Sequence, residues 1–176
     1  MANSTISNLT ALISFDTGDL FEVVDVSEAG AARSKKITKE VLEVGLGIEI
    51  GFWNMLMSFG GASVGLTYHN NTGTYTKIGR QVTVNGFLYL NSIGSSTGVA
   101  EISGLPYTSD AGLGFSSAVS LQIQDISFAD FPMASVPAAT AKIALSEITN
   151  AGTRTTLDNT NYTSGSYMIV SATYFI

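Results

Sequence analysis

A polar loop near the C-terminus carries residue types with which proteins hold sugars. Residues 157–163 contain an acid, two amide side chains that lie two positions apart, and a tyrosine ring. Carboxylate and amide groups form directional hydrogen bonds with sugar hydroxyls, and an aromatic ring packs against the apolar face of a pyranose. A polar hairpin loop anchored by one tyrosine has the same composition, so both interpretations stay open. The candidate glycan-binding residues are Asp158, Asn159, Asn161 and Tyr162.

The chain offers little else for catalysis or metal binding. It has no cysteine and a single histidine, His69, which excludes thiolate chemistry and sites built from several histidines. His69 follows Tyr68 at the end of a predicted strand, where we expect a turn residue. No phosphate-binding loop, HExxH or GxSxG motif occurs. We therefore expect no enzymatic activity, no cofactor and no metal.

Paired carboxylates are the remaining catalytic possibility, because glycosidases use two acids that flank the scissile bond. No pair in this sequence has a spacing that requires catalysis, and solvated acids in turns explain the same residues. The acids outside the N-terminal region are Glu101, Asp110, Asp125, Asp130, Glu147 and Asp158.

Composition excludes several classes of partner. The net charge is −6, which lacks the basic footprint of a nucleic-acid-binding protein. No run reaches the roughly 18 apolar residues of a membrane helix, so we expect no membrane insertion. The first residues lack the basic start and apolar core of a signal peptide.

The elements that must position the loop are strands. From residue 62 onward, apolar residues recur with a period of two, and short stretches rich in Gly, Asn and Ser separate the runs. This pattern predicts an all-β sandwich or barrel. The expected turns lie at residues 70–73, 94–98 and 158–166.

Two local features of these strands lead to specific predictions. The alternation slips after Asp125, which predicts a β-bulge there. Asn85 and Gly86 form a strong hairpin signal, yet the alternation runs through them unbroken. A single long strand, in which Gly86 admits a close neighbour, is equally consistent.

The N-terminal region differs from the rest of the chain. Residues 1–50 hold 12 of the 22 charged residues and predict a small adaptor, whereas residues 51–176 form the sandwich. Within the adaptor we expect a strand over residues 20–26, a turn at 28–31, and a short helix over 35–42 capped by Ser34. Several sandwich strands carry no charge on either face, which indicates that another subunit covers one face.

Several short motifs, in order, resemble a domain found at the C-terminal end of many bacteriophage tail fibres and tailspikes. The last ten residues, 167–176, look like the closing strand of that domain, and residues 19–42 resemble a short module near the attachment regions of such fibres. The motifs are FGGASVGLTY (59–68), TGTYTKIGR (72–80), VTVNG (82–86), GSSTG (94–98) and ISGLPY (102–107).

The resemblance implies a virion protein with a jelly-roll-like β-sandwich knob, assembled as a homotrimer. It implies adsorption to a host surface, often to polysaccharide, and it places Gly86 inside one strand. This chain has no β-helix, the region in which spike-type depolymerases of the family carry their catalytic acids. We therefore expect a structural protein and no enzyme.

The leading hypothesis is a short trimeric tail fibre that binds a host surface glycan and attaches to other virion proteins through residues 1–50. The alternative is a capsid cement, decoration or head-fibre trimer that stabilises the capsid. A glycan hydrolase ranks last. Under each hypothesis, assembly would take place in the cytoplasm of the bacterial host and the protein would reside in the virion.

Overall fold

The computed structural model describes residues 20–24, 34–112, 114 and 116–176. These residues fall into two compact units, divided between Ile48 and Glu49. The turn expected at residues 28–31 lies outside the described residues. No helix in the described part of the chain is long and apolar enough to cross a membrane.

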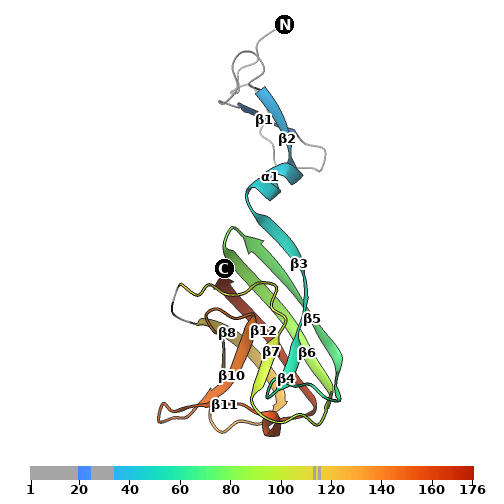
Figure 1. Ribbon diagram of the computed structural model, residues 1–176, viewed down its shortest axis with the longest axis vertical. Coiled ribbons are helices and arrows are strands. Elements are labelled where there is room, and N and C mark those ends of the chain that lie inside the picture. Colours follow the sequence, from blue (N-terminus) through green and yellow to red (C-terminus); the bar gives the residue numbers. More distant parts are fainter. Residues whose placement is uncertain (1–19, 25–33, 113, 115) are drawn as a thin grey trace. The chain divides into compact units, whose positions relative to one another are not determined.

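The first unit contains an antiparallel strand pair and one short helix (Figure 1). Strand β1 (Leu20–Val24) pairs with β2 (Ser34–Thr38), and helix α1 (Lys39–Gly45) follows directly. The predicted helix start at Ser34 is wrong, because residues 34–38 form strand β2, which pairs with β1. The cap is Thr38 instead, whose Oγ1 accepts a hydrogen bond of 3.3 Å from the backbone N–H of Val41.

The second unit is an antiparallel β-sandwich, as the sequence predicted (Figure 1). Its strands follow the spatial order β3-β5-β6-β12-β8-β9-β10-β7-β4, and β11 pairs with β10. The two ends of this path, β3 and β4, are joined through Met55, so one bent segment of chain belongs to both layers. The elements are β3 (Ile48–Asn54), β4 (Leu56–Phe59), β5 (Leu66–Ile78), β6 (Gln81–Ile93), β7 (Ala100–Ser103), β8 (Ser117–Ile126), β9 (Phe131–Val136), β10 (Lys142–Ile148), β11 (Arg154–Thr156), the 3-10 helix η3 (Asn159–Asn161) and β12 (Tyr162–Phe175).

The core lies between the two layers and follows the predicted alternation. Alternate residues of β6 and β12 point inward and meet apolar residues from β4, β7 and β10. The largest of the fully buried side chains include Tyr174, Phe59, Met55, Met57, Leu88, Leu90, Ile102, Ile143 and Met168.

Two glycines admit the indole of Trp53 into this core. Gly73 of β5 and Gly86 of β6 lie opposite each other, both with inward-facing positions. A Cβ at Gly73 would lie 2.2 Å from Nε1 of Trp53, and one at Gly86 would lie 2.4 Å from Sδ of Met55. Gly86 is thus inside one strand, as the resemblance implied. The turn predicted at residues 70–73 is wrong, because β5 continues through them and pairs with β6.

The predicted irregularity after Asp125 is confirmed. Tyr162 pairs with Ile126 and Tyr167 pairs with Gln124, so four residues of β12 lie opposite Asp125 alone. Asp125 adopts a left-handed backbone conformation with φ of 54°, which a non-glycine residue rarely does.

The Tyr68 side chain and a tight turn form hydrogen bonds with backbone groups on the open edge of β4. The Tyr68 hydroxyl accepts a hydrogen bond from the backbone N–H of Met57 at 2.8 Å and donates to the Met57 carbonyl at 3.4 Å. Phe59 exchanges backbone hydrogen bonds with Ala62 at 2.8 and 3.2 Å. The outward backbone groups of Met57 and Phe59 are therefore both paired.

Candidate interaction surface

The outer face of the layer formed by β3, β5, β6, β12 and β8 carries no charged side chain among the outward positions that the structure describes. We call it the uncharged face. Strand register places its residues in rows across the layer, for example Thr72, Phe87, Ile169 and Gln122. The charged pair Lys142–Glu101, 2.8 Å apart, lies on the other layer. The residues of the uncharged face are Ile50, Phe52, Asn70, Thr72, Thr74, Thr76, Ile78, Gln81, Thr83, Asn85, Phe87, Tyr89, Ser120, Gln122, Gln124, Tyr167, Ile169, Ser171, Thr173 and Phe175.

Large apolar side chains are exposed on this face. The exposed fraction is 84% for Phe52, 76% for Ile50 and 57% for Ile78. Ile169 and Phe175 on β12 are also exposed. An antiparallel layer that faces water normally alternates apolar inward with polar outward residues, and contiguous exposed apolar patches mark interaction sites.

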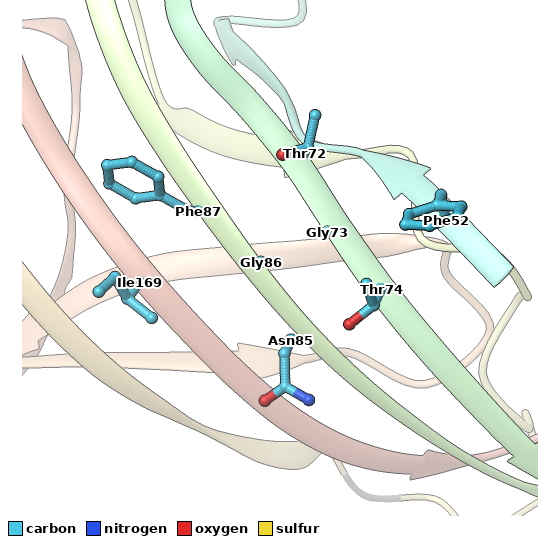
Figure 2. Close-up of a pocket in the computed structure, with 8 residues that line it drawn as sticks. All are labelled: Phe52, Thr72, Gly73, Thr74, Asn85, Gly86, Phe87 and Ile169. Carbon is cyan, nitrogen blue, oxygen red and sulfur yellow. The ribbon is translucent and has the colours of Figure 1, made fainter. Parts of the chain in front are cut away.

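An open hollow of about 590 Å³ lies near the centre of the uncharged face. Figure 2 shows Phe52 of β3 on one side of it, and Phe87 of β6 with Ile169 of β12 on the other. The short side chains of Thr74 and Asn85 lie between them. The hollow exists because small polar residues separate three large apolar ones, and its lining is mostly apolar.

An aromatic cluster occupies one end of the uncharged face. The ring centroids of Phe87, Tyr89 and Tyr167 lie 5.9 to 6.3 Å apart, and the imidazole of His69 lies 4.6 Å from the Tyr89 ring. His69 is inside β5, at a break in register with β6, so its predicted place before a turn is wrong. The Tyr167 hydroxyl donates to Oε1 of Gln124 at 2.8 Å.

The polar residues of the predicted glycan loop are used mainly to build the loop itself. Asp158 caps η3 and accepts hydrogen bonds from the hydroxyl and the N–H of Thr160, which lower the pKa of its carboxyl. Asn159 Oδ1 accepts from the N–H of Gly98 at 2.8 Å. The amide of Asn161 accepts from the N–H of Asp158 at 2.8 Å and donates to a backbone carbonyl of the β8–β9 turn at 2.7 Å.

The fourth residue of that loop, Tyr162, belongs to the core. Its side chain is 3% exposed, and its ring centroid lies 5.5 Å from that of Phe59. Burial raises the pKa of the Tyr162 hydroxyl, which has no hydrogen-bond partner among the described residues. The ring therefore presents no face to a sugar in this conformation. Glycan binding by the other three residues stays a prediction.

A carboxylate held by two tyrosines lies where β3 begins, and no pattern in the sequence indicated it. The hydroxyls of Tyr75 and Tyr107 each donate to Glu49 at 2.6 Å, and the two rings meet edge to face with centroids 5.9 Å apart. The hydrogen bonds from Tyr107 and Tyr75 lower the pKa of Glu49. Lys77 Nζ lies 5.7 Å from the centroid of the Tyr107 ring. This cluster attaches β3 to β5 and to the loop after β7.

Several of the acids considered for catalysis have individual partners. Asp110 pairs with Arg80, and Glu101 pairs with Lys142. Glu147 accepts a hydrogen bond of 2.5 Å from a backbone N–H of the β8–β9 turn. Among the residues that the structure describes, no group of three His, Cys, Asp or Glu side chains is placed to hold a metal ion.

Comparison with known proteins connects this sandwich to one solved structure. No protein-family model and no curated protein matches the chain. The crystal structure of the Dettilon tailspike protein matches with a TM-score of 0.58 and 19% sequence identity. The match covers 73% of this chain and 24% of the tailspike chain, so this chain spans about a quarter of that protein's length. At this identity, the similarity shows that this chain shares its fold with part of the tailspike protein.

Proposed function

We propose that the chain is a phage tail-associated structural protein whose sandwich assembles as a homotrimer through the uncharged face. The observation that carries the proposal is this face, on a sandwich that shares its fold with part of a tailspike protein. The number of copies comes from the resemblance of the sequence to trimeric tail fibres and tailspikes.

Electrostatics supports self-association through this face. The chain carries a net charge of −6, so two copies repel each other through most orientations. Burying an unpaired charge at an interface is costly, and interface cores are accordingly depleted of charged residues and enriched in aromatic ones. The uncharged face avoids both costs, and its Thr, Ser, Asn and Gln side chains provide hydrogen bonds between copies.

The finer role that we propose is a short tail fibre that adsorbs to host surface polysaccharide and attaches to the virion through residues 1–50. Deleting residues 1–44 should abolish incorporation into particles and leave the sandwich folded. A capsid cement, decoration or head-fibre trimer is the alternative, and capsids that lack the protein would then lose resistance to heat or osmotic shock. A glycan hydrolase would release reducing ends from capsule.

The assembly can be tested by placing a charge at the centre of the face. Light scattering should give about three times the chain mass of 18.4 kDa for the wild type at micromolar concentration. Ile169→Lys would bury an ammonium group in every interface and should give single chains. Phe131→Lys is the matched control, because Phe131 is 58% exposed and lies outside the uncharged face. A monomeric wild type, or an assembled Ile169→Lys variant, would refute the proposal.

A further inference from the structure

A second hollow, of polar character, lies at the irregularity between β8 and β12. Its volume is about 430 Å³, within the range of roughly 300–1,000 Å³ that is typical of small-molecule sites. We call it the bulge pocket. Its lining residues are Asp125, Ile126, Ser127, Asn161, Thr163 and Ser164.

The strained backbone of Asp125 shapes this pocket. Its left-handed conformation is maintained because its carbonyl accepts hydrogen bonds from the hydroxyls of Thr163, at 3.4 Å, and of buried Ser166. Strain of this kind persists only where surrounding structure imposes it, and it clusters at functional sites. The bulge also directs the Asp125 side chain to solvent instead of into a strand pair.

The bulge pocket has hydrogen-bonding groups that are free to bind a ligand, whereas those of the predicted glycan loop are mostly paired within the protein. The Asp125 carboxylate has one weak contact, 3.5 Å from Nε2 of Gln124, so most of its acceptor positions remain open. The Ser164 hydroxyl is exposed and has no hydrogen-bond partner among the described residues. An acceptor-only carboxylate beside hydroxyls that both donate and accept matches the hydroxyls of a sugar ring.

The aromatic cluster of the uncharged face is connected to the pocket through Gln124. Gln124, the neighbour of Asp125, accepts a hydrogen bond from Tyr167 at 2.8 Å. Tyr167 belongs to the aromatic cluster of the uncharged face, and its ring centroid lies 5.9 Å from that of Phe87. The proposed assembly covers this cluster with other copies of the chain, so the pocket lies beside the interface and recognition there depends on its own hydrogen-bonding groups.

The position of the pocket within the sandwich favours access. The unit begins at Glu49, and β3 enters at the end of the sandwich where Glu49 binds the tyrosine pair. Figure 1 shows η3 and the β8–β9 turn at the opposite end of this unit. The bulge pocket therefore lies at the end of the sandwich that is remote from the entry of the chain.

We propose that the bulge pocket binds a neutral saccharide, whose ring hydroxyls donate to the Asp125 carboxylate and exchange hydrogen bonds with Thr163 and Ser164. The proposal rests on the proposed function for its source, a polysaccharide of the host surface. A neutral sugar fits because the pocket has one carboxylate and no cation among its lining residues, so an acidic sugar would be repelled.

The test is binding of the full chain to an array of structurally defined neutral and acidic bacterial oligosaccharides, followed by calorimetry on the best neutral ligand. Asp125→Asn should weaken binding about tenfold or more, because it replaces a charged acceptor while asparagine tolerates the left-handed conformation. Ser164→Ala should weaken it about threefold. Asp130→Asn is the matched control, since Asp130 is an exposed acid outside the pocket, and its affinity should match the wild type.

Each outcome bears on one proposal. Wild-type affinity in both Asp125→Asn and Ser164→Ala, at unchanged melting temperature, would overturn the bulge pocket. Retention of acidic sugars only, or of no sugar, would overturn it as well. The scattering mass of the same samples reports separately on assembly. A trimer that binds no neutral sugar therefore leaves the proposed assembly intact, and a monomer that binds one leaves the pocket intact.

Discussion

Replacing Gly73 with alanine tests whether the indole of Trp53 must lie directly on the backbone of β5 and β6. The new Cβ would lie 2.2 Å from Nε1 of Trp53 and 2.5 Å from the carbonyl oxygen of Asn85. Real Cβ atoms essentially never show separations below 3.0 Å. The indole must therefore move away from the strand pair, and the backbone at Asn85 cannot easily follow because it belongs to the ladder.

The cost has two parts. Overpacking a well-filled core costs about 1–3 kcal/mol. Moving the ring also breaks the 3.1 Å hydrogen bond from Nε1 of Trp53 to the Asn85 carbonyl, and an unpaired buried donor costs about 1–3 kcal/mol. The side chain of Trp53 is 5% exposed, so little water can replace the lost acceptor. We expect Gly73→Ala to reduce the free energy of unfolding by about 2–6 kcal/mol.

Equilibrium unfolding in urea at one fixed protein concentration measures this loss, because the stability of an assembling protein depends on concentration. Gly112→Ala is the control: its Cβ would meet Asp110 Oδ1 at 3.2 Å, a contact that a side chain at the surface can relieve. In a Trp53→Phe background the penalty of Gly73→Ala should shrink, since the indole N–H is absent.

Either of two results would contradict this expected loss of stability. Gly73→Ala within about 0.5 kcal/mol of the wild type would mean that the core absorbs the methyl group without cost. An equal penalty in the wild-type and Trp53→Phe backgrounds would mean that the clash is with the backbone alone.

Three further substitutions test individual contacts. Hydrogen bonds from the hydroxyls of Tyr107 and Tyr75 lower the pKa of Glu49 below its usual 4.5. The stability that these bonds give the folded protein is therefore present above pH 4.5 and is lost as pH falls through the folded-state pKa. Thermal melts between about pH 6 and about pH 3 should therefore fall more steeply for the wild type than for Glu49→Gln, and parallel curves would contradict this. Tyr162→Phe removes a buried hydroxyl without a partner among the described residues and should leave the melting temperature unchanged or higher; a clear decrease would reveal a hydrogen bond to that hydroxyl. Asn159→Ala removes the acceptor for the Gly98 N–H and should cost about 1 kcal/mol in urea unfolding, a loss that would be absent if the loop were held by its other contacts alone.

The sandwich was predictable because apolar residues alternate with polar ones along its strands, as expected where one face of each strand is buried. The alternation across residues 82–90 survives in β6, where the even-numbered positions are buried. The slip after Asp125 was visible for the same reason, since a bulge shifts the phase of burial. Both patterns are local, because successive side chains of a strand point to opposite faces of the sheet.

The predictions of a turn at residues 70–73 and of a helix cap at Ser34 were wrong because contacts with other segments of the chain determine the structure there. Residues 70–73 have turn composition, yet Gly73 is there because Trp53, far earlier in the chain, lies on it within a strand. Ser34 is a good helix cap by type, but pairing with β1 extends residues 34–38 and moves the cap to Thr38. No pattern within either segment reports these contacts.

The contacts of the predicted glycan loop could not be derived from its residue types. Asp158, Asn159 and Asn161 are indeed hydrogen-bonding residues, and the fold uses their groups to close η3 and to attach it to neighbouring turns. Tyr162 starts β12, whose alternation turns its ring into the core. The uncharged face was anticipated from composition, whereas the residues that share it required the register of the paired strands.

The paired edge of β4 affects how the protein behaves when many copies are crowded together. An open strand edge is a template on which a foreign strand can add, and repeated addition leads to cross-β aggregates. At this edge the Tyr68 phenol already occupies both outward groups of Met57, and the turn to Ala62 occupies those of Phe59. An incoming strand would find the donors and acceptors of these two residues already used. Strand addition at Met57 and Phe59 is therefore disfavoured, and the Tyr68 phenol and the turn to Ala62 provide protection that other sandwiches obtain from edge lysines or prolines.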